Sequence, residues 1–310
     1  MEPELPPPET QSPLLVIVGP TASGKTSLAL RIAEAAGGEI ISADSVQVYR
    51  GFDIGAGKPT PEERARVPHH LIDVADPGDP MDAASWAVLA DQAIAQVRAR
   101  GRLPVVCGGT FLWVRSLLFG LAAAPPADPV IRERHRVLAE TGGRGAVHGA
   151  LRQVDPAAAA RLSPNDFIRV SRALEVFELT GTPQTEWHAR HGFREPRYAA
   201  KLVGIRFTAE ELSARIAARV HGMFAAGLVD EVRRLVSEGH GRARATQSVG
   251  YRQVLEMLDA QAQGPTPIDL VALEEAIVRA TRVFARRQRT WLRDQPVQWL
   301  TPEAAARFTP

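Results

Sequence analysis

The chain has little cysteine, and Cys107 is its single thiol-bearing residue. A disulfide within one chain needs two cysteines and a cysteine zinc site needs several, so the sequence excludes both. With 310 residues, the chain can bury a large hydrophobic core without such a staple. One isolated cysteine also fits a reducing compartment, and we expect a cytoplasmic protein.

Long apolar runs and a strong net charge are absent too. No run reaches the roughly 18 apolar residues that cross a bilayer, so we expect no membrane partner. The 37 Lys and Arg residues nearly balance the 35 Asp and Glu residues, and the net charge of +2 does not by itself predict a nucleic-acid binder. Residues 1–13 are rich in proline and glutamate and lack the basic start and apolar run of a signal peptide, so we predict a disordered tail.

Short apolar runs separated by helical patterns fill the first third of the chain. Residues 14–18, 39–43 and 103–107 are wholly or mostly apolar, and each is predicted to be a buried parallel strand. A helix follows the first run to about Ala36, and Asp82 can cap another helix. Strands that alternate with helices predict a right-handed parallel α/β sheet.

The loop after the first predicted strand matches the phosphate-binding pattern G-x-x-x-x-G-K-[ST]. It consists of Gly19, Pro20, Thr21, Ala22, Ser23, Gly24, Lys25 and Thr26. Glycines let backbone N–H groups converge on phosphate oxygens at a helix N-terminus, Lys25 adds a positive charge, and the Thr26 hydroxyl can ligate Mg²⁺. We therefore predict a phosphorylated ligand with Mg²⁺ as cofactor; a glycine-rich turn without a ligand is the alternative. The pattern does not distinguish a nucleotide from a prenyl diphosphate.

The pattern changes after Gly120. Residues 126–194 carry helical signals, for example over 167–179, and no convincing strand. A strand is predicted again at residues 201–207, and residues 209–293 are mostly helical in pattern. We predict an α/β fold in which a P-loop-type parallel sheet flanked by helices, residues 14–125 and 195–310, carries a small inserted all-helical domain, residues 126–194.

Asp44 ends the second predicted strand, and Gly108, Gly109 and Thr110 end the third. In open α/β sheets, ligands bind beyond the carboxyl ends of the strands, so Asp44 and the phosphate loop are predicted to share one edge. A turn cap is the alternative for Asp44, because aspartate favours that position in any case. An ATPase would carry an Mg²⁺-holding aspartate after the third strand, and the Gly-Gly-Thr found there weighs against NTP hydrolysis.

Further sequence markers extend in order from Leu14 to about Leu300. Besides the phosphate loop, they are residues 41–45, 48–55, 58–59, 68–73, 108–110, 155–156, 169–175, 249–253 and 287–292. In their order and spacing the chain resembles bacterial tRNA dimethylallyltransferases. It departs from them at Gln47, where bacterial relatives often carry a hydrophobic residue, and it lacks the zinc-finger extension of eukaryotic relatives.

The resemblance implies dimethylallyl diphosphate as donor and the anticodon stem-loop of tRNA as acceptor, through the exocyclic N6 amine of the adenosine 3′ to the anticodon. The catalytic residues it implies are Asp44 as proton acceptor, Thr110 near the amine and Arg219 on the diphosphate. From its spacing alone, Arg219 fits a solvated helix arginine equally well. The inserted domain would grip the tRNA, and we expect a monomer.

Arginines recur every three or four residues near the C-terminus, at Arg279, Arg282, Arg286, Arg289 and Arg293. On a helix they form one stripe, and no acidic residue lies between Val278 and Arg293 to pair with them. Unpaired like charges at this spacing repel, so we predict phosphate contacts; a solvated charged face is the alternative. Together with those that the resemblance implies, the expected tRNA contacts are Asp44, Ser45, Val46, Gln47, Thr110, Arg132, Ile168, Arg169, Val170, Ser171, Arg172, Gln247, Gly250, Tyr251, Arg252, Arg286, Arg287, Gln288, Arg289, Trp291 and Arg293.

Two other functions are open from the sequence. A small-molecule or nucleoside kinase would share the phosphate loop and could hold an acceptor hydroxyl with Asp44, although the arginine stripe and the end of the third strand argue against it. A non-enzymatic RNA-binding module would leave the phosphate loop unused.

Overall fold

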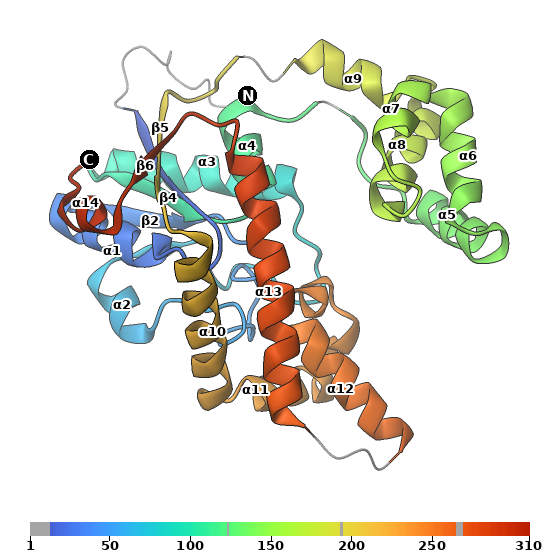
Figure 1. The fold of residues 1–310 in the computed structure, drawn as a ribbon. Helices are drawn as coiled ribbons and strands as arrows, with labels where there is room; N and C mark the ends of the chain where they lie inside the picture. The colour runs from blue at the N-terminus through green and yellow to red at the C-terminus, as the bar shows by residue number, and fades with distance from the viewer. Residues whose placement is uncertain (1–12, 123, 193–194, 265–268) are drawn as a thin grey trace. The chain divides into compact units, whose positions relative to one another are not determined.

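The structure is a computed structural model that describes residues 13–122, 124–192, 195–264 and 269–310 (Figure 1). Except for Pro13, the predicted disordered tail lies outside the described residues. The chain divides into two compact units: Phe119–Arg197, here called the inserted unit, and the core unit, which comprises the sequence before and after it. None of the described helices is long and apolar enough to cross a bilayer.

The core unit is built on a six-stranded sheet in which every neighbouring pair is parallel, in the order β3-β2-β4-β1-β5-β6. Its strands are β1 (Leu14–Val18), β2 (Glu39–Ser42), β3 (His69–His70), β4 (Pro104–Gly108), β5 (Ala200–Ile205) and β6 (Val297–Leu300). The predicted α/β class is confirmed, and four of these strands were predicted to within a residue or two. The sequence analysis missed β3, which has two residues, and β6, a short edge strand.

Helices cover both faces of this sheet (Figure 1). They are α1 (Lys25–Ala36), α2 (Pro61–Arg66), α3 (Ala83–Ala99), α4 (Phe111–Phe119), α10 (Ala209–Ala225), α11 (Leu228–Ser237), α12 (Tyr251–Gln263), α13 (Leu270–Leu292) and α14 (Pro302–Arg307), with short 3₁₀ turns at His240–Arg242 and Arg244–Gln247. Leu15 and Ile17 of β1 pack in one core cluster with α1 and α14. Successive strand side chains point to opposite faces, so Val16 faces the other way, and α3 lies against β2 and β4 with its Trp86 Nε1 donating to the Ser42 carbonyl at 3.1 Å.

The described secondary structure of the inserted unit is entirely helical. Its helices are α5 (Pro129–Gly142), α6 (Arg144–Val154), α7 (Pro156–Arg161), α8 (Phe167–Thr180) and α9 (Gln184–His191). Val147, Leu151 and Ala158 pack against Val170 and Ala173 of α8 to form its core. The helix predicted at residues 167–179 is α8, whereas the unit begins seven residues before and ends three residues after the predicted 126–194.

A buried carboxylate holds α5 to α8 inside the inserted unit. The Glu175 side chain is fully buried, and it accepts hydrogen bonds from Arg132 Nε at 2.9 Å, from Arg172 Nη1 at 2.6 Å and from the backbone N–H of Asp128 at 2.7 Å. Burial would raise the pKa of Glu175, but these hydrogen bonds outweigh it and hold the pKa below its ordinary value. Arg132 and Arg172, expected to contact tRNA, therefore have a structural partner that the sequence analysis did not identify.

We predict that Glu175→Gln, which keeps the shape and removes the charge, lowers the free energy of unfolding of the inserted unit by about 2 kcal/mol. Because the pKa in the folded state lies below the ordinary value of 4.5, the charge stabilises the unit above that pH and the benefit disappears as the pH falls. Hydrogen exchange of the α5 and α8 amides in the full chain measures this. Glu186→Gln, which removes an exposed pair with Arg190, is the control and should change little.

Candidate active site

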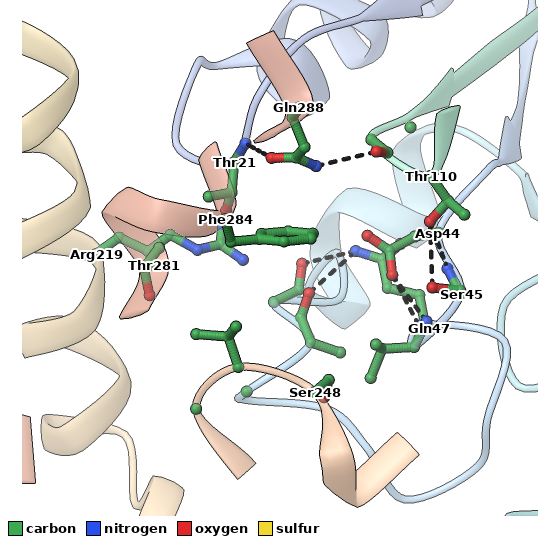
Figure 2. A pocket seen from close by; sticks show the side chains of 18 of the residues that line it. Thr21, Asp44, Ser45, Gln47, Thr110, Arg219, Ser248, Thr281, Phe284 and Gln288 are labelled. Atoms are coloured by element: carbon green, nitrogen blue, oxygen red, sulfur yellow. Dashed lines mark hydrogen bonds between the residues drawn. The ribbon is translucent and has the colours of Figure 1, made fainter. Parts of the chain in front are cut away.

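Three loops meet at the carboxyl edge of the sheet, because they follow the adjacent strands β2, β4 and β1. The phosphate loop follows β1, Asp44 follows β2, and Gly109 and Thr110 follow β4. Residues of all three line one pocket of about 600 Å³, to which α10 and α13 also contribute. Figure 2 shows Arg219 and Asp44 entering this pocket from different elements, with Gln288 bridging two of the loops.

The phosphate loop ends where α1 begins at Lys25. Ala22 and Gly24 adopt left-handed backbone angles, with φ of 63° and 77°, and turn the chain into the helix. Burial lowers the pKa of the Lys25 ammonium, against the opposing effect of Asp44. Lys25 and Thr26 line the main pocket and also a second pocket of about 350 Å³, which Arg215 and Arg219 border. The loop thus separates two spaces that share its lysine and threonine.

Arg219 of α10 places a guanidinium at the same two pockets. Burial lowers its pKa, and Asp44 acts in the opposite direction. No hydrogen bond or ion pair joins the guanidinium to another of the described residues. A Cβ added at Gly57 would lie 2.2 Å from Arg219 Nη2, so glycine at residue 57 leaves room for the guanidinium in this position. A desolvated cation without a partner favours an anionic ligand, which does not fit the alternative of a solvated helix arginine.

Asp44 caps a turn with one carboxylate oxygen and leaves the other unused. Oδ1 accepts from the backbone N–H of Val46 at 2.9 Å and of Gln47 at 3.3 Å, while Oδ2 accepts no hydrogen bond from the described residues. Thr110 lies beside it, and its Oγ1 accepts from the Ser45 N–H at 3.0 Å. The turn-cap alternative is therefore correct for Oδ1, and Oδ2 still offers a proton acceptor to the pocket.

Gln47 ties the end of β2 to the segment that packs against Arg219. Its Oε1 accepts from the Ser42 hydroxyl at 2.9 Å, and its Nε2 donates to the carbonyls of Ala56 at 3.3 Å and Gly57 at 3.0 Å. Gln47 thus gives the pocket wall three hydrogen bonds that an apolar side chain could not make.

Glu231 and Tyr251 organise that same wall, and sequence reasoning missed the first of them. The Glu231 carboxylate accepts three backbone N–H groups, from Asp53, Ile54 and Gly55, at 2.7–3.1 Å, and the Tyr251 hydroxyl at 2.7 Å. Burial, followed by the neighbouring Glu231 charge, raises the pKa of Tyr251. Glu231 falls on the buried stripe of α11 with Leu228, Val232 and Leu235, and an acid on such a stripe was the available signal.

The predicted RNA surface on α13 is exposed, with one correction. Arg279 pairs at 3.3 Å with Glu275, which lies just before the acid-free stretch of residues 278–293. Arg282, Arg286, Arg289 and Arg293 are exposed and make no ion pair with the described residues. Like-charged neighbours without counter-ions form a surface suited to phosphates.

The remaining expected tRNA contacts divide into three groups. Ser45, Val46, Gln247, Gly250, Arg252 and Arg287 line the main pocket. Ile168, Arg169 and Trp291 are exposed, with Arg169 paired to Asp166 at 3.2 Å. Val170, Ser171, Tyr251 and Gln288 are at least nine-tenths buried and pack or brace their elements, and direct tRNA contact stays a prediction for them.

The comparisons with known proteins agree with this arrangement. The family model described as IPP transferase matches residues 47–295, and that described as isopentenyl transferase matches residues 12–73. The chain is 59% identical over 94% of its length to the tRNA dimethylallyltransferase of Sorangium cellulosum, covering 91% of that protein. It is 49% identical over 95% of its length to that of Anaeromyxobacter dehalogenans, covering 98% of it.

A solved structure extends the likeness to three dimensions. The tRNA isopentenylpyrophosphate transferase of Bacillus halodurans is 36% identical and superposes with a TM-score of 0.67, over 94% of this chain and 90% of that one. Family model, sequence relatives and structural neighbour coincide with a phosphate loop that faces a carboxylate across one pocket. The chain therefore belongs to the IPP transferase family.

Proposed function

We propose that the chain transfers a dimethylallyl group from dimethylallyl diphosphate to the N6 amine of the adenosine 3′ to the anticodon of tRNA and releases diphosphate. The observation that carries this proposal is the pairing, in one pocket, of two partly buried cations with a carboxylate oxygen that accepts no hydrogen bond from the described residues. Relatives with up to 59% identity carry the name tRNA dimethylallyltransferase, which supports the same reaction.

On the donor side, the phosphate loop holds the leaving group. The diphosphate lies against the loop amides. Its negative charge compensates the positive charges of Lys25 and Arg219, whose pKa values burial lowers. As the bond between the allylic carbon and the bridging oxygen breaks, its electron pair stays on that oxygen. The two cations stabilise this developing charge, which is greater in the transition state than in the bound donor.

On the acceptor side, Asp44 accepts the proton that the adenine amine loses. The adenine amine is a weak nucleophile because its lone pair is delocalised into the ring. As the new nitrogen–carbon bond forms, the amine proton passes to Oδ2 of Asp44, the oxygen that is free of backbone hydrogen bonds. Thr110, held against Ser45, lies next to this carboxylate and helps to position the amine.

The residues present fit a Mg²⁺ ion that comes with the donor. Mg²⁺ binds few protein ligands and takes the rest from phosphates and water, and no cluster of three acidic or metal-binding side chains occurs in the described part of the chain. Thr26 lines both pockets at the phosphate loop and would hold the ion through its hydroxyl. When bound, Mg²⁺ would neutralise charge on the leaving diphosphate.

The kinase alternative makes the opposite prediction for the phosphate loop. A kinase would transfer phosphate from ATP, whereas this pocket offers a proton acceptor beside a leaving-group site. Incubation of the purified chain with unmodified tRNA and either ATP or dimethylallyl diphosphate separates the two. Nucleoside mass spectrometry should detect a prenylated adenosine with the allylic donor alone; phosphorylation from ATP without prenylation would refute the proposal.

Asp44→Asn keeps a turn-capping oxygen and removes the proton acceptor. We expect single-turnover prenylation to fall about 10²- to 10⁴-fold while tRNA affinity changes little. Asp76→Asn, which removes an exposed carboxylate paired with Arg50, is the matched control and should be unaffected. A rate for Asp44→Asn close to that of the unaltered chain would eliminate Asp44 as the base.

Arg282→Gln combined with Arg289→Gln tests the arginine surface of α13. If both contact phosphates, tRNA affinity falls and its dependence on salt flattens, by about 0.7 to 0.9 in the log–log slope for each lost contact. The same measurement on Arg233→Gln, whose arginine pairs with Asp230 on α11, should leave the slope unchanged. An unaltered slope in the double variant would show that these arginines form a solvated charged face and do not contact phosphates.

A further inference from the structure

Gln288 is buried on α13, and its amide joins two loops of the active site. Its Oε1 accepts from the backbone N–H of Thr21 in the phosphate loop at 2.8 Å, and its Nε2 donates to the carbonyl of Gly109 after β4 at 3.0 Å (Figure 2). The Gln288 residue is only 9% exposed. Both functional ends of the side chain therefore bond to active-site backbone.

The bridge requires the chemistry of an uncharged amide. One end of the side chain must accept a hydrogen bond and the other end must donate one. An amide can do both, whereas a carboxylate can only accept and an ammonium can only donate. The fit is also close, because a Cβ added at Gly109 would lie 2.5 Å from Gln288 Nε2. Glycine at position 109 therefore leaves room for the Gln288 amide beside the loop after β4.

The two loops belong to the two halves of the reaction. Thr21 lies within the loop that would cradle the diphosphate. Gly109 precedes Thr110, whose Oγ1 holds the Ser45 N–H next to Asp44. A shift of Gln288 therefore acts on the donor loop and on the acceptor side together.

The same helix carries the RNA surface. Arg286 and Arg289 flank Gln288 within three residues and are exposed, while Gln288 itself points inward. A polyanion bound to these arginines would fix the position and rotation of α13, and with them the amide that braces the phosphate loop. The helix thus gives a direct mechanical path from tRNA to donor site.

We propose that Gln288 is a positioning residue that couples tRNA binding on α13 to diphosphate binding in the phosphate loop. The coupling rests on the proposed function, since it needs both ligands. RNA bound to α13 holds Gln288 in its bridge, the bridge holds Thr21 and Gly109, and the donor loop is then set for diphosphate. By linkage, diphosphate raises the affinity for RNA by the same factor.

The test is the affinity of the full chain for inorganic pyrophosphate with Mg²⁺, titrated calorimetrically with and without a saturating anticodon stem-loop RNA. In the unaltered chain, RNA should raise this affinity by about 5-fold or more, within the usual range of coupling between sites. In Gln288→Met, which keeps the length and loses both hydrogen bonds, the enhancement should fall below about 2-fold, while RNA affinity measured without pyrophosphate stays near that of the unaltered chain. Gln263→Met, at the exposed end of α12, is the matched control.

A second variant approaches the bridge from its other side. Gly109→Ala pushes on Gln288 Nε2 without changing α13, and it should also abolish the enhancement, which keeps the test decisive if Gln288→Met does not fold. The coupling is refuted if a folded Gln288→Met or Gly109→Ala chain retains the RNA effect, or if the unaltered chain has none. Because prenylation of tRNA by the unaltered chain is measured separately, its absence would instead reject the proposed function.

Discussion

The active site depends on partly buried positive charge that has no bonded counter-ion among the described residues. Arg219 has a pKa lowered by burial and makes no ion pair with the described residues, and burial also lowers the pKa of its neighbour Lys25. Such a pair of cations is unfavourable in the empty site, and only folding of the surrounding structure maintains it. The unfavourable free energy of this cation pair favours binding of an anion there, above all one whose negative charge grows as the reaction proceeds.

The wall opposite these cations is correspondingly rigid. Glu231 receives three consecutive backbone N–H groups and the Tyr251 hydroxyl, and Gln47 adds bonds to the carbonyls of Ala56 and Gly57. These contacts fix the segment against which the Arg219 guanidinium packs. Distant parts of the chain, from β2 to α12, therefore act together on the placement of a single side chain.

The local parts of this arrangement could be predicted from sequence, and the long-range parts could not. Buried strands at residues 14–18 and 39–43 and the phosphate loop have local signatures, so their order placed Asp44 and Lys25 at one edge of the sheet. Glu231 bonds to Ile54, which is 177 positions away, and Gln288 bonds to Thr21, which is 267 positions away. The local periodicity of the sequence does not reveal contacts over such distances. The burial of Val170 and Tyr251 could not be read from sequence either, because it depends on which elements pack around them.

Ion pairing distinguishes the arginines that stabilise the protein from those that can bind a ligand. Arg132 and Arg172 in the inserted unit are bound to Glu175, so much of their charge is neutralised within that unit. Arg219 and the outer arginines of α13, such as Arg289, make no ion pair with the described residues. With a net charge of only +2, the chain attracts phosphate through the placement of such unpaired cations rather than through their number. The partly buried ones suit a compact diphosphate and the exposed ones an extended polyanion, and α13 both lines the pocket and carries exposed arginines.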